Sequence, residues 1–295
     1  MKLKIETPKD FNFEQCLRFL NRHRLESTHR VIPEGVLKLL PTSKGPMLLS
    51  IRTNAENLEV EVLNDAPDAI VQSEIAIYVQ DWFDLKVDLT DFYSQTTDDP
   101  VLGTLVKKFR GLRLIGIPDL FEALAWAIIG QQINLSFAYQ LKKRVVEAYG
   151  EKIFHHEQYH YSFPDPEVIE ALKPEDLREM QFSNSKARYL INLAQAAVAG
   201  KLNKQELQTM SVTQVSDHLC QLKGIGPWSA HYAIMKCLRF PDAFPIADVG
   251  LHNAIKNQLT LVEKPSIPKI QKLGSKWKGW EAYATFYLWH SLIMD

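Results

Sequence analysis

The first hundred residues alternate between helix-like and strand-like patterns of hydrophobic positions. Two stretches place hydrophobic residues at helical spacing, and they predict helices over residues 11–24 and 73–83. Three short runs of hydrophobic residues, two of them clearly alternating with polar ones, predict strands over residues 36–40, 47–52 and 58–63. We therefore expect a small α+β domain with an antiparallel sheet over residues 1–99.

The rest of the chain has a different pattern. The acid-rich residues 96–100 are typical of a joint between domains, and strand patterns largely vanish after them. Several predicted helices begin with a proline beside an acidic residue, as at Pro118 and Asp119, which favours a helix start. We expect an all-helical region over residues 100–295, divided into two subdomains. Its predicted helices cover residues 100–109, 118–129, 134–149, 166–171, 174–180, 184–199, 203–208, 211–221, 227–238, 248–258, 265–272 and 280–294.

Composition places the chain among soluble globular proteins. Its 295 residues suffice for two domains, and 46% hydrophobic with 23% charged residues is ordinary for that class. No apolar run is long enough to span a membrane, and the acid-bearing first six residues do not resemble a signal peptide. We expect a monomer that does not bind a membrane and that acts in the cytoplasm, or in the nucleus of a eukaryote.

The formal net charge of −1 conceals an asymmetry between the two regions. Residues 1–99 carry 11 Lys and Arg against 17 Asp and Glu, a net charge of −6. Residues 100–295 carry 23 against 18, a net charge of +5. Any surface that faces a nucleic acid should therefore lie on the second region, although this modest excess could also be an ordinary solvated face.

Cysteine and histidine spacing gives no support for a metal centre made of side chains. The cysteines Cys16, Cys220 and Cys237 are odd in number and widely separated, so they predict neither a zinc site nor a disulfide framework. His155, His156 and His160 belong to a polar, aromatic-rich stretch that we expect to be a loop, without the spacing that places two ligands on one helix face.

The segment 211–238 predicts a helix, a six-residue hairpin and a second helix. The hairpin is Leu222-Lys223-Gly224-Ile225-Gly226-Pro227. Glycine allows the positive φ of a tight turn and the close approach of another backbone. The amides near the two glycines, at the start of the second helix, form a ready anion site that suits a DNA phosphate.

A tight interhelical turn with a glycine cap is the alternative interpretation of this hairpin. Ile225 argues against it, because an apolar side chain at a loop tip needs a pocket between the two helices. Hairpins of this kind also occur in several classes of DNA protein, so the hairpin does not by itself indicate an enzyme.

Asp248 follows the second hairpin helix and opens another predicted helix. Taken alone, the aspartate could be a plain N-cap residue. That role is compatible with a chemical one, because a helix N-terminus stabilises a carboxylate in its charged form.

Together these features resemble the helix-hairpin-helix (HhH-GPD) DNA glycosylases, and within them the 3-methyladenine DNA glycosylase II, or AlkA-like, branch. The resemblance rests on the hairpin residues 222–230, on Asp248 twenty positions after Trp228, on residues 128–132 and on the aromatic helix 280–289. It covers about residues 100–295, and over residues 1–99 only a similar small α+β domain supports it. It implies an enzyme of base excision repair that flips a damaged base out of double-stranded DNA.

The resemblance assigns the chemistry to Asp248, which would stabilise the oxocarbenium-like sugar as an alkylated base leaves. Members of the family that also cut the strand carry a lysine two residues after the second hairpin glycine. Trp228 occupies that position here, so we expect hydrolysis without lyase activity. Lys223 precedes the glycines and is expected to contact phosphate together with Gly224, Ile225 and Gly226.

Four aromatic residues match the family's base-binding cleft. They are Trp228, Tyr232, Tyr283 and Trp289. A cationic alkylated base gains about 0.5–2 kcal/mol from each aromatic face that it stacks on. Helical aromatic residues at such spacing are often core residues instead, and Tyr283 is the one for which that alternative is strongest.

The resemblance also implies a wedge and a cation. Gln131, Gln132 and Ile133 lie where relatives fill the gap left by the flipped base, and either Gln132 or Ile133 could be the inserted residue. An ordinary interhelical turn is the alternative.

Main-chain carbonyls of Cys220, Leu222 and Ile225 are expected to hold a monovalent cation, as in relatives. No other cofactor is expected.

Two other functions compete with an alkyl-base glycosylase. A non-catalytic protein that binds damaged DNA could use the same hairpin, but it would not need Asp248. A glycosylase for oxidised or deaminated bases is the second alternative, and for oxidised bases the absent lysine argues against it.

Overall fold

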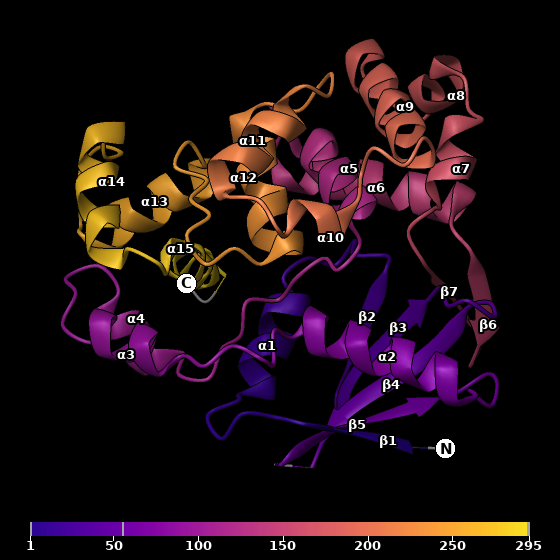
Figure 1. Ribbon diagram of the computed structural model, residues 1–295, viewed down its shortest axis with the longest axis horizontal. Coiled ribbons are helices and arrows are strands. Elements are labelled where there is room, and N and C mark those ends of the chain that lie inside the picture. The colour runs from indigo at the N-terminus through magenta and orange to yellow at the C-terminus, as the bar shows by residue number, and fades with distance from the viewer. Residues whose placement is uncertain (1, 55, 294–295) are drawn as a thin grey trace.

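A five-stranded antiparallel sheet forms the core of the N-terminal region in the computed structural model, which describes residues 2–54 and 56–293. The strand order is β1-β5-β4-β3-β2 (Figure 1). The strands are β1 (Lys2–Glu6), β2 (His29–Ile32), β3 (Gly35–Leu40), β4 (Met47–Thr53) and β5 (Asn57–Val62). The three predicted strands are confirmed as β3, β4 and β5, and the predicted α+β domain with an antiparallel sheet is confirmed with them.

The two strands that the pattern did not predict, β1 and β2, lie at the edges of this sheet. In β1 only Ile5 is fully buried, and in β2 no residue is, so neither strand has a hydrophobic alternation strong enough to be recognised. Helices α1 (Phe13–Leu20) and α2 (Ala69–Trp82) add further buried residues to this region. Helix α1 begins two residues after its predicted start and α2 begins four residues before its own, and the side chains of Asn12 and Asp68 cap them.

Beyond this sheet the chain is almost entirely helical, as predicted. Helix α3 (Thr90–Thr96) and helix α4 (Gly103–Lys108) cross to the C-terminal helices, and α4 packs beside α15 (Figure 1). The other helices are α5 (Leu120–Gly130), α6 (Leu135–Tyr149), α7 (Pro166–Glu170), α8 (Pro174–Glu179), α9 (Asn184–Val198), α10 (Lys204–Leu207), α11 (Val212–Cys220), α12 (Pro227–Ala233), α13 (Val249–Gln258), α14 (Ile267–Gly274) and α15 (Glu281–Ser291). None of the helices in the described ranges combines the length and the hydrophobicity that crossing a membrane requires.

The expectation of a loop around His155 and His160 is wrong. These residues form a β-hairpin, with β6 (Lys152–His155) paired antiparallel to β7 (Gln158–Tyr161). His156 and Glu157 turn the hairpin with φ values of +45° and +60°. Positive φ at both central residues matches the twist of the strands, but the usual Asn-Gly or Asp-Gly signal is absent, so the sequence did not reveal the turn.

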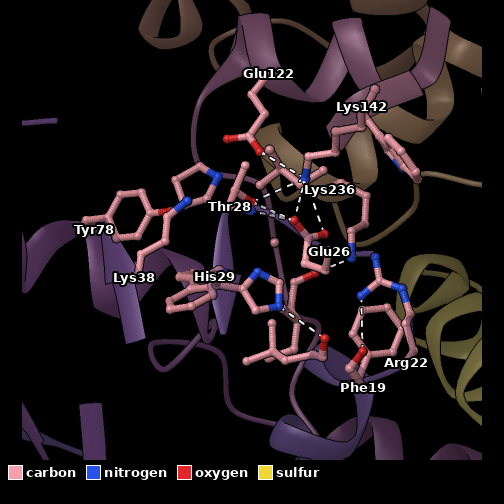
Figure 2. Close-up of a pocket in the computed structure, with 17 residues that line it drawn as sticks. Phe19, Arg22, Glu26, Thr28, His29, Lys38, Tyr78, Glu122, Lys142 and Lys236 are labelled. Atoms are coloured by element: carbon pink, nitrogen blue, oxygen red, sulfur yellow. Dashed lines mark hydrogen bonds and ion pairs between the residues drawn. The ribbon is translucent and has the colours of Figure 1, made fainter. Parts of the chain in front are cut away.

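A buried ionic cluster joins the two regions around a cavity of about 40 Å³ (Figure 2). Lys142 of α6 lies 3.0 Å from Glu26 and 3.5 Å from Glu122, and it also donates a hydrogen bond to Thr28. Burial disfavours the charge on Lys142, but Glu26 and Glu122 outweigh that effect and raise its pKa. Burial also disfavours the charge on Glu26, yet Lys142 holds the pKa of that carboxyl well below its ordinary value. The ion pair between Lys142 and Glu26 thus connects the helical region to the N-terminal region, and each residue stabilises the charge of the other.

Candidate active site and nucleic-acid interface

Asp248 is the N-cap residue of α13, and three N–H groups converge on its carboxylate. Oδ1 accepts hydrogen bonds from the Leu251 amide at 2.7 Å and from the Trp289 indole at 2.7 Å. Oδ2 accepts one from the Trp228 indole at 3.0 Å. Three donors and the positive end of the helix dipole therefore stabilise a negative charge at this position.

The chain before Asp248 is anchored to the N-terminal region. Helix α12 continues into a π-helical turn (Ile234–Leu238), and the next residue, Arg239, has a left-handed backbone (φ +67°) that reverses the chain. The Arg239 guanidinium then donates hydrogen bonds to Asp81 at 2.8 Å and to the Leu114 carbonyl at 2.7 Å. Because this anchor fixes the start of the connecting segment, Asp248 is held relative to both regions of the molecule.

Three of the four predicted pocket aromatics form a continuous group beside Asp248. The ring of Tyr232 lies 5.8 Å from Trp228 and 6.0 Å from Trp289, measured between centroids. Trp228 and Trp289 are half-buried. Tyr232 is buried between them, and burial raises the pKa of its phenol, which keeps it neutral.

The placement of Tyr283 in the pocket is wrong. Its hydroxyl donates a hydrogen bond to Asp84 at 2.5 Å, and its ring packs against Phe92 and Trp280. Tyr283 and Trp289 are six positions apart on α15, which at about 100° per residue places them on different faces. Tyr283 is therefore a core residue that connects α15 to the N-terminal region.

The hairpin between α11 and α12 contains two glycines with different structural roles. Gly224 has φ +94°, and a Cβ atom there would lie 2.4 Å from the ring of Tyr189. Ile225 is buried, as expected for an apolar side chain that fills the space between two helices. The fold itself therefore requires glycine at position 224.

Gly226 is not required by the fold. Its backbone is extended, with φ −105° and ψ 178°, and a Cβ atom there would meet no described atom within 4 Å. Any residue adopts that conformation, so the reason for a glycine must lie outside the folded chain. Close approach of another backbone, as predicted for a DNA phosphate, is such a reason.

Replacing Gly226 with valine is expected to change the free energy of unfolding by less than about 1 kcal/mol. The same change should weaken binding to duplex DNA about tenfold, because the side chain blocks the exposed amides. Fluorescence anisotropy on duplexes of different sequence, together with chemical denaturation, measures both effects. Gly224→Val is the matched control and should lose stability as well. Wild-type affinity in Gly226→Val, or a loss confined to damaged DNA, would contradict the phosphate role.

The loop after α5 is bound directly to the hairpin. The Gln131 side-chain amide donates hydrogen bonds to the Gly224 carbonyl at 2.7 Å and to the Ser229 hydroxyl at 2.9 Å. Gln132 is exposed and has a left-handed backbone with φ +55°, whereas Ile133 packs partly against the core. Of Gln131, Gln132 and Ile133, Gln132 is therefore the one that is exposed to solvent.

The hairpin carbonyls were predicted to hold a cation. The Leu222 carbonyl accepts a hydrogen bond from the Ile225 amide at 3.0 Å. In the described chain the carbonyls of Cys220 and Ile225 accept no backbone hydrogen bond outside regular helices and strands. Carbonyl oxygens of this kind are the ligands that hard cations prefer. The hairpin residues are therefore compatible with a bound monovalent cation.

Family models cover nearly the whole chain. Residues 125–279 match the model of the HhH-GPD superfamily base excision DNA repair protein. Residues 3–124 match the N-terminal domain of 8-oxoguanine DNA glycosylase. The two matched ranges meet in the middle of α5.

Individual relatives agree with these models. A DNA-3-methyladenine glycosylase of Bacillus subtilis (strain 168) is 40% identical over 291 residues, which cover 98% of this chain and 96% of the relative. DNA-3-methyladenine glycosylase 2 of Escherichia coli (strain K12) is 30% identical over 192 residues, or 64% of each chain. Among solved structures, a 3-methyladenine DNA-glycosylase from Archaeoglobus fulgidus has a TM-score of 0.84 at 23% identity over 97% of both chains, and so shares the fold.

Proposed function

This chain belongs to the HhH-GPD superfamily of base excision DNA repair proteins, and we propose that it releases alkylated bases of the 3-methyladenine type from double-stranded DNA by hydrolysis. The relative of 40% identity, which matches along its whole length, carries the name of that activity. The observation that carries the proposal is the carboxylate of Asp248, fixed by three N–H donors beside half-buried aromatic rings. We propose that the protein acts as a monomer.

The hydrogen bonds leave one oxygen of Asp248 better placed for chemistry than the other. A carboxylate oxygen offers about two lone-pair positions, and Oδ1 already accepts two hydrogen bonds. Among the described residues, Oδ2 accepts a hydrogen bond from the Trp228 indole alone, which leaves one of its lone pairs for other partners. We assign to Oδ2 the stabilisation of the positively charged sugar as the glycosidic bond breaks, and the orientation of the attacking water.

The aromatic group suits a base that is already a good leaving group. Alkylation at a ring nitrogen gives the base a positive charge, so its departure needs little help from an acid. Trp228 and Trp289 are half-buried, and each cation–π contact with such an indole contributes about 0.5–2 kcal/mol. Neutral, undamaged bases gain less from such faces, which favours damaged bases over normal ones.

Contacts with the rest of the DNA fall to the hairpin and to the loop beside it. A Cβ atom at Gly226 would meet no described atom within 4 Å, and we assign the amides at this position to a backbone phosphate. Gln132, which is exposed in the loop after α5, is assigned to the gap left by the flipped nucleotide. The side chain of Gln131 holds this loop against the hairpin. The carbonyls of Cys220, Leu222 and Ile225 are those that would hold a monovalent cation, which would rigidify the hairpin.

We propose that the enzyme is monofunctional. The lysine of strand-cutting relatives has no counterpart at Trp228, whose indole is committed to Asp248. An oligonucleotide with one alkylated base tests this point: the base should be released while the strand stays intact until alkali is added. Borohydride should trap no protein–DNA adduct. Strand cleavage without alkali, or a trapped adduct, would show that another amine serves as a nucleophile.

A further inference from the structure

A polar groove of about 500 Å³ runs beside the hairpin, between α8, α9 and Lys223. The residues that line it are Pro174, Asn184, Ser185, Arg188, Tyr189, Ile191, Asn192 and Lys223. None of these is acidic, and two are basic. The groove is therefore suited to an anion with several oxygen atoms.

The groove is continuous with the hairpin and with the loop after α5. The ring of Tyr189 in α9 lies directly against Gly224, where it leaves no room for a Cβ atom. One turn before it, the Lys186 ammonium donates a hydrogen bond to the Ile129 carbonyl at the end of α5, at 2.7 Å. Because Gln131 also bonds to the Gly224 carbonyl, α9, the loop and the hairpin form one fixed surface.

The charged groups of the groove are free to bind a partner. Arg188 and Lys223 are exposed, and within residues 2–54 and 56–293 neither forms an ion pair or a side-chain hydrogen bond. The arginine fork matches the geometry of a phosphate, and a lysine supplies a mobile point charge. Ser185 and Asn192 add neutral donors of the kind that commonly contact the DNA backbone.

We propose that this groove binds the sugar-phosphate backbone of DNA. Arg188 and Lys223 would each contact a phosphate of the strand that the hairpin binds. The inference rests on the proposed function, since it requires DNA on the hairpin. It extends the interface from the α11–α12 hairpin onto α9. The contact carries no sequence information, so it adds affinity for any duplex and leaves the choice of base to the aromatic pocket.

The salt dependence of DNA binding tests the groove. Removing one phosphate-binding charge reduces the magnitude of the slope of log K against log salt concentration by about 0.9. Arg188→Gln and Lys223→Gln should each show that change on undamaged duplexes of several sequences, and the double variant should show about twice the change. Arg188→Lys should retain the wild-type slope, because the charge is kept.

The matched control is Lys201→Gln, an exposed lysine beyond the opposite end of α9 that does not line the groove. Wild-type slopes in Arg188→Gln and Lys223→Gln, or an equal decrease in Lys201→Gln, would overturn the proposed groove. Affinity of the groove for an acidic protein but not for DNA would do the same. A wild-type protein that released no base from methylated DNA would refute the proposed function separately, because the slopes are measured on undamaged DNA.

Discussion

Replacing Asp248 with asparagine is expected to slow base release by at least about 10²–10³-fold at saturating enzyme. Asparagine retains an oxygen for the Leu251 amide, so the cap of α13 should persist. The negative charge that stabilises the sugar is removed. The new side-chain NH₂ group would also face the indole N–H of Trp228, so that two hydrogen-bond donors oppose each other. The effect should therefore appear in the rate constant for the chemical step rather than in DNA affinity.

Single-turnover kinetics on an alkylated oligonucleotide measures the rate constant, and anisotropy measures the affinity. Asp242→Asn is the matched control, because it removes an exposed carboxylate from the same connecting segment without touching the indoles. A wild-type rate in Asp248→Asn would mean that the protein binds damaged DNA without acting through this aspartate.

Replacing Lys142 with methionine is expected to lower the free energy of unfolding by about 3–5 kcal/mol. The side chains of Lys142 and Glu26 are 6% and 8% exposed, so removal of the lysine leaves Glu26 and Glu122 buried, with no other partner within ion-pair distance in residues 2–54 and 56–293. Desolvated carboxylates that lose their counter-ion are far less stable than an intact pair or an apolar replacement.

Urea denaturation of Lys142→Met and of Lys143→Met measures this effect. Lys143 is adjacent in α6 but is 41% exposed and pairs with Glu147 on the surface, so its loss should cost less than about 1 kcal/mol. Adding Glu26→Gln to Lys142→Met should restore part of the stability, because one unpaired charge is removed. Equal stability of the two single variants would contradict the role of the cluster in joining the two regions.

Local features of the chain were predicted well because neighbouring residues determine them. Strand β4 is buried on both faces over most of its length, so its hydrophobic run was easy to recognise. The hairpin around Gly224 and the helix start at Asp248 depend on residues within one or two turns. Asp248 was predicted both as a cap and as a chemical group, and its geometry is compatible with both.

Contacts between distant residues were beyond prediction from a single sequence. Trp289 meets Asp248 across 41 positions, and Lys142 meets Glu26 across 116. The requirement for glycine at position 224 comes from Tyr189, which no local pattern connects with the hairpin. Tyr283 was misplaced because aromatic residues on one helix were grouped by type, whereas their angular positions separate them into pocket and core.

The most direct test of the central claim is to incubate the protein with methylated double-stranded DNA and identify the released bases by chromatography. We expect free 3-methyladenine from the wild-type protein, release at least about 10²-fold slower from Asp248→Asn, and strands that break only after alkali. Release of no base, or release of oxidised bases alone from oxidised DNA, would contradict that claim.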